Sequence, residues 1–480
     1  MNAMSTHLAS TARGRMSAAA LAAALLAAAL LAVSPARAQT EASPAAWGEQ
    51  QAQALLAAVG SPATAASRVA DGPAWQMLRQ QLARSLQDHP EARATVASGL
   101  GARAATREAA AARRPQISLE AETGHRDNDP NELQGTGRRD WDTGSVGLTL
   151  RQPVWDGGTV DAQVAASTAF ADGVEARGQA RRADFALRMV QASLERVRAQ
   201  RLLDQARLQV QARDEIVADL TRRHELGGGT LSDVWRARSR AVEARGALVQ
   251  AEARLQSAEA SCRELLGADI PAELDLRPPP LPDLAAVLAA PASVQDGFAA
   301  VVAAQAAVRT AEQELEVARR RDGPRVDLDA GVSRRDLVGG RRAGTDWQAG
   351  LTLRHSFYVG GADDARIAQA RARLDEAGEQ LRNTRLQLER SLRQALAEDQ
   401  IGEPLLEARR EGVKLAVDAL RGVREQFAFR RGSLLDVMNA QDTLHAAGNA
   451  WVEAEHSRAL TRWRIAYFTG SLMPWIGVAP

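Results

Sequence analysis

The residue types that most often perform chemistry are few in this 480-residue chain, and they are not arranged for catalysis. It has one cysteine, Cys262, and seven histidines, which lack the spacing of a metal site. No nucleophile motif, phosphate-binding loop or paired cysteine pattern is present. A formal net charge of +1 also provides no basic footprint for nucleic acid. The sequence therefore predicts a protein that is not an enzyme, with no cofactor, no metal and no nucleic-acid partner.

Two acidic residues stand out because they occupy equivalent places in similar motifs. Asp233 follows Thr230 by three residues, and Asp436 follows Ser433 in the same way. A hydroxyl residue followed by an acid at this spacing is typical of a capping box, which opens a helix, and the helix dipole favours an acid in the first turn. The two acids could serve as caps alone, or as caps that also have a further role.

The two motifs belong to an internal repeat in which matched residues lie 203 positions apart, as 147 and 350 do. The matched segments are GLTLR at 147–151 and 350–354, Gly157-Gly158 and Gly360-Gly361, and GTLSDV at 229–234 with GSLLDV at 432–437. Chance similarity between alanine-rich helices would not keep glycines and whole motifs in one register. Residues 73–267 and 292–470 are therefore predicted to be tandem structural repeats.

The remaining segments have different compositions. Residues 1–38 read as a signal peptide, with a basic start, an apolar stretch and the small-x-small cleavage site Ala36-Arg37-Ala38. Residues 39–72 are weakly patterned and are expected to be loosely ordered. The proline-rich residues 268–291 are expected to connect the repeats, and residues 471–480 form a C-terminal tail.

Each repeat contains two short segments in which apolar and polar residues alternate. They are residues 116–124 and 145–153 in the first repeat, and 325–333 and 347–355 in the second. Each has the length of a tilted strand that crosses a bilayer, with one apolar and one polar face, although a half-buried soluble sheet alternates in the same way. Arg151 and Arg354 fall on the polar face, where they could line a lumen or form internal salt bridges.

Long helical segments follow these strands. A proline-free stretch from Thr159 to Leu226 predicts a helix about 100 Å long, which reverses at a tip turn over 227–230 and returns over 231–266. The second repeat copies this with helices at 362–429 and up to Phe468, around a tip turn over 430–433. Shorter helices are expected at about 91–113 and 292–321. Four strands cannot close a barrel, so copies of the chain must complete it.

This order of elements resembles the TolC family of outer-membrane export channels over about residues 74–470. The motifs that carry the resemblance are DHPE at 88–91, WDGG at 155–158, YVGG at 358–361 and GSLLDVMNAQ at 432–441. The resemblance implies a mainly α-helical fold with a small membrane β-barrel. Three copies would form a twelve-stranded barrel in the cell outer membrane and an α-helical tunnel, a large periplasmic extension.

In this family, acidic and aromatic residues near the tip turns narrow the periplasmic entrance. The resemblance assigns the periplasmic aperture to Ser232, Asp233, Phe427, Arg430, Asp436 and Asn439. Phe427 stands where some members have a gating tyrosine, and Asn439 stands where some have a second acid. Gly432 stands where a gating arginine can occur. This chain therefore departs from the latch of those members at all three positions.

Glycines and aromatic residues mark the junctions between strands and long helices. The predicted strand–helix hinges are Gly157, Gly158, Gly360 and Gly361. The aromatic residues that flank the strand ends are Trp155, Phe357 and Tyr358. We expect these three to lie at the membrane interface, with packing at the strand–helix joint as the alternative.

The resemblance implies passive conduction of a substrate handed over by inner-membrane machinery. The implied partners are further copies of the chain, a periplasmic adaptor (membrane fusion) protein, outer-membrane lipid, and an inner-membrane ABC exporter or proton-driven pump. The sequence has no lipid-anchor cysteine after the signal, and DHPE resembles the secretion branch. Type I protein secretion is therefore the favoured function, with multidrug efflux as the alternative and a coiled-coil structural protein as the third interpretation.

Overall fold

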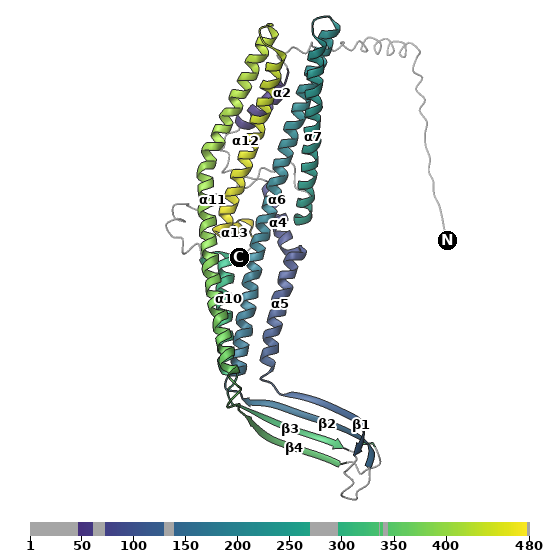
Figure 1. Ribbon diagram of the computed structural model, residues 1–480, viewed down its shortest axis with the longest axis vertical. Coiled ribbons are helices and arrows are strands. Elements are labelled where there is room, and N and C mark those ends of the chain that lie inside the picture. Colours follow the sequence, from purple (N-terminus) through teal and green to yellow (C-terminus); the bar gives the residue numbers. More distant parts are fainter. Residues whose placement is uncertain are drawn as a thin grey trace, which may run out of the picture. The chain divides into compact units, whose positions relative to one another are not determined.

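The structure, a computed structural model, describes residues 47–60, 73–128, 139–268, 296–335, 337–338 and 344–477. Long helices and one four-stranded antiparallel sheet make up these residues (Figure 1). The mainly α-helical fold with a small sheet is thereby confirmed. The predicted signal peptide at 1–38 lies outside the described residues, as does the connector at 268–291 beyond its first residue.

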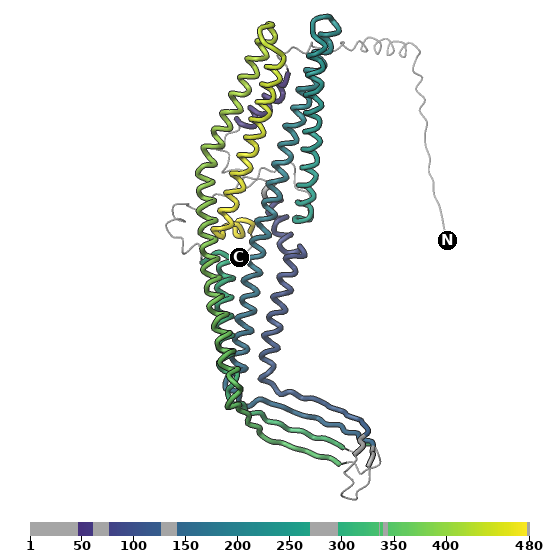
Figure 2. Tube along the Cα trace, viewed as in Figure 1, coloured from purple at the N-terminus to yellow at the C-terminus, as the bar shows by residue number. Residues whose placement is uncertain are grey.

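Four long helices form two hairpins. They are α6 (Thr159–Glu225), α7 (Leu231–Leu266), α11 (Ala362–Ala428) and α12 (Leu434–Phe468). Figure 2 shows α6 reversing into α7 and α11 reversing into α12 at short turns. The ends predicted for α6 and α11 were each one residue too long. With 67 residues, α6 is about 100 Å long at the rise of an α-helix.

Shorter helices flank the hairpins: α4 (Pro73–Asp88), α5 (Pro90–Ala111), α10 (Ala299–Arg320) and α13 (Leu472–Ile476). The DHPE motif has a clear local role at the start of α5. His89 is the N-cap, its Nδ1 accepts a hydrogen bond from the Glu91 backbone N–H at 3.3 Å, and Pro90 opens the helix. A proline suits this position because the first helical N–H needs no partner within the helix.

One sequence expectation is wrong at the N-terminal side. Residues 39–72 were expected to be loosely ordered, yet residues 49–60 form the helix α2 (Glu49–Gly60). Its buried side chains, Gln51, Ala52, Leu55 and Val59, follow one stripe of the helix. Trp47, just before α2, is fully buried. The stripe is short and rich in alanine and glutamine, so its amphipathic pattern is weak in the sequence.

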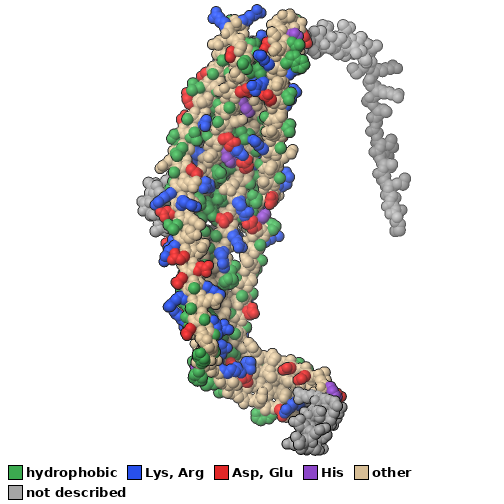
Figure 3. All heavy atoms as spheres, in the orientation of Figure 1, with side chains coloured by type: hydrophobic (Ala, Val, Ile, Leu, Met, Phe, Trp, Pro, Cys, Tyr) green, Lys and Arg blue, Asp and Glu red, His purple; other side chains and the backbone are tan. Residues whose placement is uncertain are grey.

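The chain divides into two compact units. The smaller unit combines the segment up to Ala54 with residues 208–245 and 415–445, so it contains both tip turns. The larger unit contains the sheet and the rest of the helices. On the face shown in Figure 3, basic and acidic side chains are interspersed along the helices. This face therefore offers no uniform charge for a nucleic acid.

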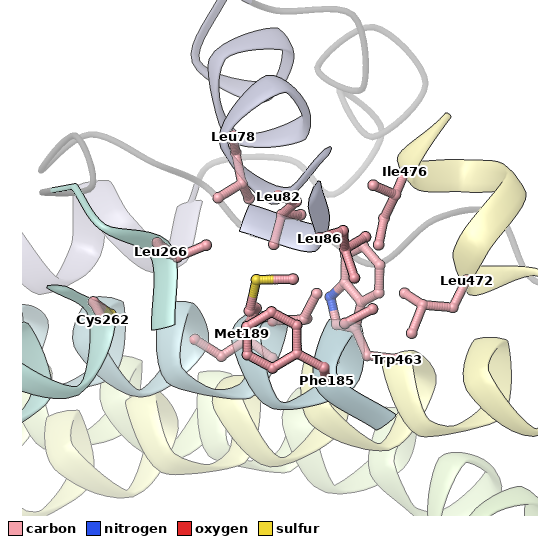
Figure 4. Close-up of a cluster of buried hydrophobic side chains, with 13 residues drawn as sticks. Leu78, Leu82, Leu86, Phe185, Met189, Cys262, Leu266, Trp463, Leu472 and Ile476 are labelled. Carbon is pink, nitrogen blue, oxygen red and sulfur yellow. The ribbon is translucent and has the colours of Figure 1, made fainter. Parts of the chain in front are cut away.

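The larger unit has an apolar core where α4, α6, α7, α12 and α13 meet (Figure 4). Its members include Leu78, Leu82 and Leu86 of α4, Phe185 and Met189 of α6, Trp463 of α12, and Leu472 and Ile476 of α13. Cys262 and Leu266 of α7 complete it, so the lone cysteine is a small packed residue, as the sequence indicated. This cluster attaches the short helices to the long ones.

The sheet has the order β1-β2-β3-β4, with every neighbouring pair antiparallel. Its strands are β1 (Gln116–Asn128), β2 (Arg139–Trp155), β3 (Arg325–Arg335) and β4 (Gly344–Arg354). The alternation located all four strands but made β1 and β2 clearly too short, ended β3 two residues early and began β4 three residues late. Strands β1 and β2 continue to pair through polar residues from His125 to Asn128, because ladder hydrogen bonds do not require apolar side chains.

The register sorts the side chains onto two faces. One cross-strand row contains Leu119, Leu148, Val332 and Trp347, and the adjacent row contains Ser118, Thr149, Gly331 and Gln348. Successive rows point to opposite faces, so one face is apolar and the other is polar. The apolar face is open: Leu119 is 71% exposed and Trp347 is 82% exposed.

We expect Leu82→Ala in the apolar core to lower the free energy of unfolding by about 2–5 kcal/mol, because the truncation leaves a cavity among fully buried side chains. Thermal unfolding of the full-length protein, followed by the helical circular dichroism signal, measures the effect. The matched control is Leu100→Ala on α5, where the side chain is 62% exposed. Equal shifts in the two variants would contradict the assignment of the core.

Candidate aperture and strand–helix joints

The first tip turn joins α6 to α7 through glycine and a capping box. Gly227 has a positive φ of 78°, which glycine adopts without steric cost. The Thr230 hydroxyl donates a hydrogen bond to Asp233 Oδ2 at 2.7 Å, and the Asp233 backbone N–H donates to Thr230 Oγ1 at 3.2 Å. The Thr230 side chain therefore caps α7, and the Asp233 carboxylate accepts its hydrogen bond from the Thr230 hydroxyl.

The second tip turn repeats this geometry with one difference. The Ser433 hydroxyl and backbone N–H both donate to Asp436 Oδ2, at 2.7 and 3.0 Å, and the Asp436 N–H donates to Ser433 Oγ at 3.2 Å. The hydrogen bond from the Ser433 hydroxyl, followed by that from its backbone N–H, lowers the pKa of Asp436. The reciprocal capping box is confirmed at Asp436, whereas the Asp233 carboxylate is bonded, among the described residues, only to the Thr230 hydroxyl, and a role in lining a channel stays a prediction for both acids.

Arg430 occupies the position that corresponds to Gly227 in the first tip. Among the described residues it is the one non-glycine residue with a positive φ, 57°. A left-handed conformation at a residue with a Cβ costs about 1–2 kcal/mol. The second tip turn therefore contains strain that the first avoids, and strain of this kind occurs often at functional sites.

The predicted aperture residues all lie in the smaller unit, on the two tips. Ser232, Arg430, Asp436 and Asn439 are exposed, and Asp233 and Phe427 are partly buried. Within the described part of the chain, no hydrogen bond or ion pair joins Ser232 or Asp233 to Arg430. The structure instead places Phe427 against Trp47, with ring centroids 5.4 Å apart, and against the Arg223 guanidinium at 5.7 Å.

Buried arginines near the tips are functional candidates that the sequence analysis missed. Arg213 of α6 donates to Gln441 Oε1 at 2.9 Å and to the Met438 carbonyl at 3.2 Å, and it also pairs with Asp442 of α12. These bonds link the two hairpins. Burial lowers the pKa of Arg213. A signal existed in the sequence, because Arg213 lies at heptad spacing between the buried Ala206 and Leu220.

The four predicted hinge glycines share one backbone conformation. Gly157, Gly158, Gly360 and Gly361 have φ values of 65°, 78°, 68° and 81°. At the first joint, Asp156 also accepts hydrogen bonds from the backbone N–H groups of Gly158 and Val160, at 3.0 and 2.5 Å. Glycine is therefore required for the turn from strand to helix, and movement at these joints stays a prediction.

The aromatic residues at these joints are exposed. Trp155 is 52% exposed, Phe357 is 92% exposed and Tyr358 is 87% exposed. Phe357 contacts the ring of His355 edge to face, at 4.6 Å. Such exposure does not favour packing at the joint, the alternative considered for these residues, and their place at a membrane interface stays a prediction.

The polar face of the sheet contains cross-strand ion pairs. Arg151 Nε donates to Asp329 Oδ1 at 2.8 Å, and Arg354 contacts Asp327 at 3.3 Å. Thr352 also donates to Asp329, at 3.0 Å. Of the two alternatives for these arginines, internal salt bridges are observed, and lining of a lumen stays a prediction.

Two further observations concern the described residues alone. No group of histidine, cysteine or acidic residues in them could hold a metal ion. None of their helices is both long enough and apolar enough to span a membrane.

Two long helical hairpins with capped tips, joined by glycine hinges to a small two-faced sheet, define a TolC-type outer-membrane channel. The family model for outer membrane efflux proteins matches residues 79–268 and 294–471. The chain therefore belongs to the outer membrane efflux protein family, whose members are channels rather than enzymes.

Two curated proteins show the range of the family. Outer membrane efflux protein BepC of Brucella suis biovar 1 (strain 1330) is 26% identical over 341 residues, which are 69% of this chain and 73% of BepC. Proteases secretion protein PrtF of Dickeya chrysanthemi is 26% identical over 357 residues, 71% of this chain and 75% of PrtF.

Solved structures share the fold. The crystal structure of the outer membrane protein VceC from Vibrio cholerae matches this chain with a TM-score of 0.68 and 20% sequence identity. The match covers 83% of this chain and 98% of VceC. At this identity the likeness is one of fold.

We expect the smaller unit to lose stability in mild acid. Burial lowers the pKa of His445 below its ordinary 6.5, while Asp442 raises it and Arg213 lowers it. Below pH 6.5 the unfolded chain therefore binds a proton that the folded chain does not, so the free energy of unfolding falls as the pH drops from 6.5 towards the folded pKa. Above that window this histidine adds no pH dependence.

Thermal unfolding at about pH 7.5 and about pH 5.5 tests this expectation. The unfolding midpoint should fall in acid, and His445→Gln should reduce the fall. Some of the fall should remain, because burial also lowers the pKa of His456. His224→Gln, at an exposed position on α6, is the control. A fall of the same size in the His445 variant and in the unmodified protein would contradict the assignment.

Proposed function

We propose that three copies of this chain form one export channel, with a twelve-stranded barrel in the outer membrane and a periplasmic tunnel of long helices. The sheet is the main support for this proposal, because its apolar face is exposed and each edge strand, β1 and β4, has a single neighbour. Backbone groups without partners cost several kcal/mol each in hydrocarbon, so an open sheet is unstable there. Two copies would supply about eight strands, whose interior would fill with side chains, whereas three copies leave a lumen.

Exposed stripes on two helices support assembly with further copies of the chain. Helix α7 buries a narrow, alanine-rich stripe and α11 buries one rich in leucine and valine. Each helix also exposes a second apolar stripe at heptad spacing. The exposed members are Trp235, Val242 and Val249 on α7, and Ile401, Leu405 and Leu415 on α11. Apolar residues at this spacing form coiled-coil seams. A neighbouring copy would cover both stripes and continue the helical wall.

The polar face of the sheet suits a wet lumen. Its ion pairs leave Arg151 and Arg354 neutralised by acidic neighbours, so the barrel interior would be polar without a strong net charge. At the tips, Asp233 and Asp436 have no basic partner within the described residues. Three copies of each would place carboxylates around one mouth, where they attract cations and repel anions.

We infer that the exported substrate is a protein, through a type I secretion route. The name of PrtF refers to protease secretion, and its identity to this chain equals that of BepC. Multidrug efflux is the second candidate, because BepC is named an efflux protein.

The proposed system includes a periplasmic adaptor protein and an inner-membrane ABC exporter; a proton-driven pump would replace the exporter if the channel serves efflux. A deletion strain distinguishes the two routes. Loss of one or more proteins from the culture medium, with unchanged drug susceptibility, would support secretion. Increased drug susceptibility with an unchanged set of secreted proteins would reject it in favour of efflux.

The barrel is tested by a matched pair of substitutions on β4. Leu351→Arg should cost about 2–4 kcal/mol near the bilayer midplane and reduce the yield of trimer, because Leu351 lies on the apolar face. Gln348→Arg should be tolerated, because Gln348 lies on the polar face. Cross-linking of detergent-extracted protein measures the trimer. Equal yields from the two variants would show that the faces have been misassigned.

The tip acids are tested by ion selectivity in planar bilayers. Asparagine still accepts the hydrogen bond at the start of the helix but has no charge. The double variant Asp233→Asn, Asp436→Asn therefore keeps the capping role of both residues and removes the charge that they would contribute to the channel mouth. We expect the cation selectivity at low salt to weaken while the trimer persists. An unchanged reversal potential would leave both acids as helix caps only.

A further inference from the structure

The segment that precedes and begins α2 contacts both tip hairpins within the smaller unit. The Trp47 carbonyl accepts a hydrogen bond from Arg424 of α11 at 2.6 Å, and Glu49 pairs with the same guanidinium at 2.7 Å. On the other hairpin, the Gly48 N–H donates to Glu215 of α6 at 3.3 Å. The chain at residues 47–49 is therefore bonded to α6 and α11 at once.

The indole of Trp47 forms a second link between the hairpins. The Arg223 guanidinium of α6 lies 5.8 Å from the Trp47 ring and 5.7 Å from the Phe427 ring of α11. The two rings are themselves 5.4 Å apart and tilted by 42°. Arg223 is also paired with Asp219 at 2.8 Å, which fixes its position on α6. One hairpin thus supplies the cation and the other supplies an aromatic ring, with Trp47 in contact with both.

Burial makes these contacts costly to break. Trp47 is fully buried, and Arg424 is only 2% exposed. A buried guanidinium requires its hydrogen-bonding partners, because an unpaired buried charge is strongly unfavourable. Cation–π contacts are likewise stronger when they are shielded from water. The hydrogen bond from Arg424 also holds the pKa of Glu49 below its ordinary value, so Glu49 stays ionised at neutral pH.

We propose that residues 47–54 act as a clasp that holds the two tip hairpins of each copy together and so keeps the aperture narrow. Phe427, a predicted aperture residue, is held by the clasp through Trp47. For α11 to move away from α6, the contacts of Trp47, Gly48 and Glu49 with one of the two helices must break. Opening of the tip would therefore require release of this segment. The clasp rests on the proposed channel function, since it regulates the same aperture.

Single-channel recording of the full-length channel in planar bilayers tests the clasp. Trp47→Ala and Glu49→Gln should each raise the ratio of open to closed states by about fivefold, the change expected from losing one contact of about 1 kcal/mol. Ala58→Ser is the control, because this exposed residue of α2 lies outside the clasp. The double variant Trp47→Ala, Phe427→Ala should raise the ratio of open to closed states by less than the product of the increases in the two single variants. Both substitutions remove the same contact between the rings.

Hydrogen exchange of the trimer in detergent provides a second readout. Loss of the clasp should speed exchange of the backbone amides over 415–428 of α11, even where a variant conducts poorly. Near-isosteric Glu49→Gln preserves the shape of the segment if Trp47→Ala fails to assemble. Unchanged conduction and unchanged exchange in an assembled variant would overturn the clasp while leaving the channel intact. A wild-type trimer that never conducts would instead reject the proposed function.

Discussion

The backbone of the small sheet imposes the constraint on which the rest of the structure depends. Hydrocarbon offers no water to an unpaired N–H or C=O group, so a sheet that enters it must have no free edge. This chain provides four strands with one neighbour each for β1 and β4, and an apolar face that nothing in the described chain covers. In the proposed channel, closure by symmetry would fix how the helices of neighbouring copies meet, and the exposed stripes of α7 and α11 would lie where one copy contacts the next.

Much of this architecture could be predicted because its signals are local. Helix ends followed from glycine turns and capping boxes, and the strands followed from alternation; both depend on a few neighbouring residues. The sequence did not predict the features that depend on contacts between residues far apart in the chain. The polar residues His125–Asn128 extend β1 because β2 is there to pair with them. Helix α2 is ordered although its own pattern is weak, because Arg424 and Glu215, far along the chain, bond the residues at its start.

Charged side chains show the same limit at the candidate site. Arg151 and Arg354 were correctly placed on the polar face, but their partners lie on β3 and are known only from the register. Arg213 occupies a seam position that heptad rules assign to an apolar residue, and its burial depends on Gln441 and Asp442 of the other hairpin. Removing one partner of a buried ion pair is strongly unfavourable, so Arg213 favours the pairing of these two hairpins. The tips therefore combine polar links between the hairpins with buried apolar side chains such as Ile216 and Leu420.

The repeat makes the two hairpins alike, so their differences indicate where they act differently. The first tip turns through Gly227, but the second turns through Arg430 in the same left-handed conformation, at a cost that glycine would not incur. Asp156 caps the start of α6, while Val359, its counterpart, has no side chain that could cap α11. The second hairpin is also the one whose Phe427 and Arg424 are engaged by Trp47. The second hairpin is thus held less by its own turn and cap residues and more by its contacts with Trp47. Such an element can have two positions, because release of those contacts alone can shift it. In the proposed channel we therefore expect the second hairpin to be the part of each copy that moves.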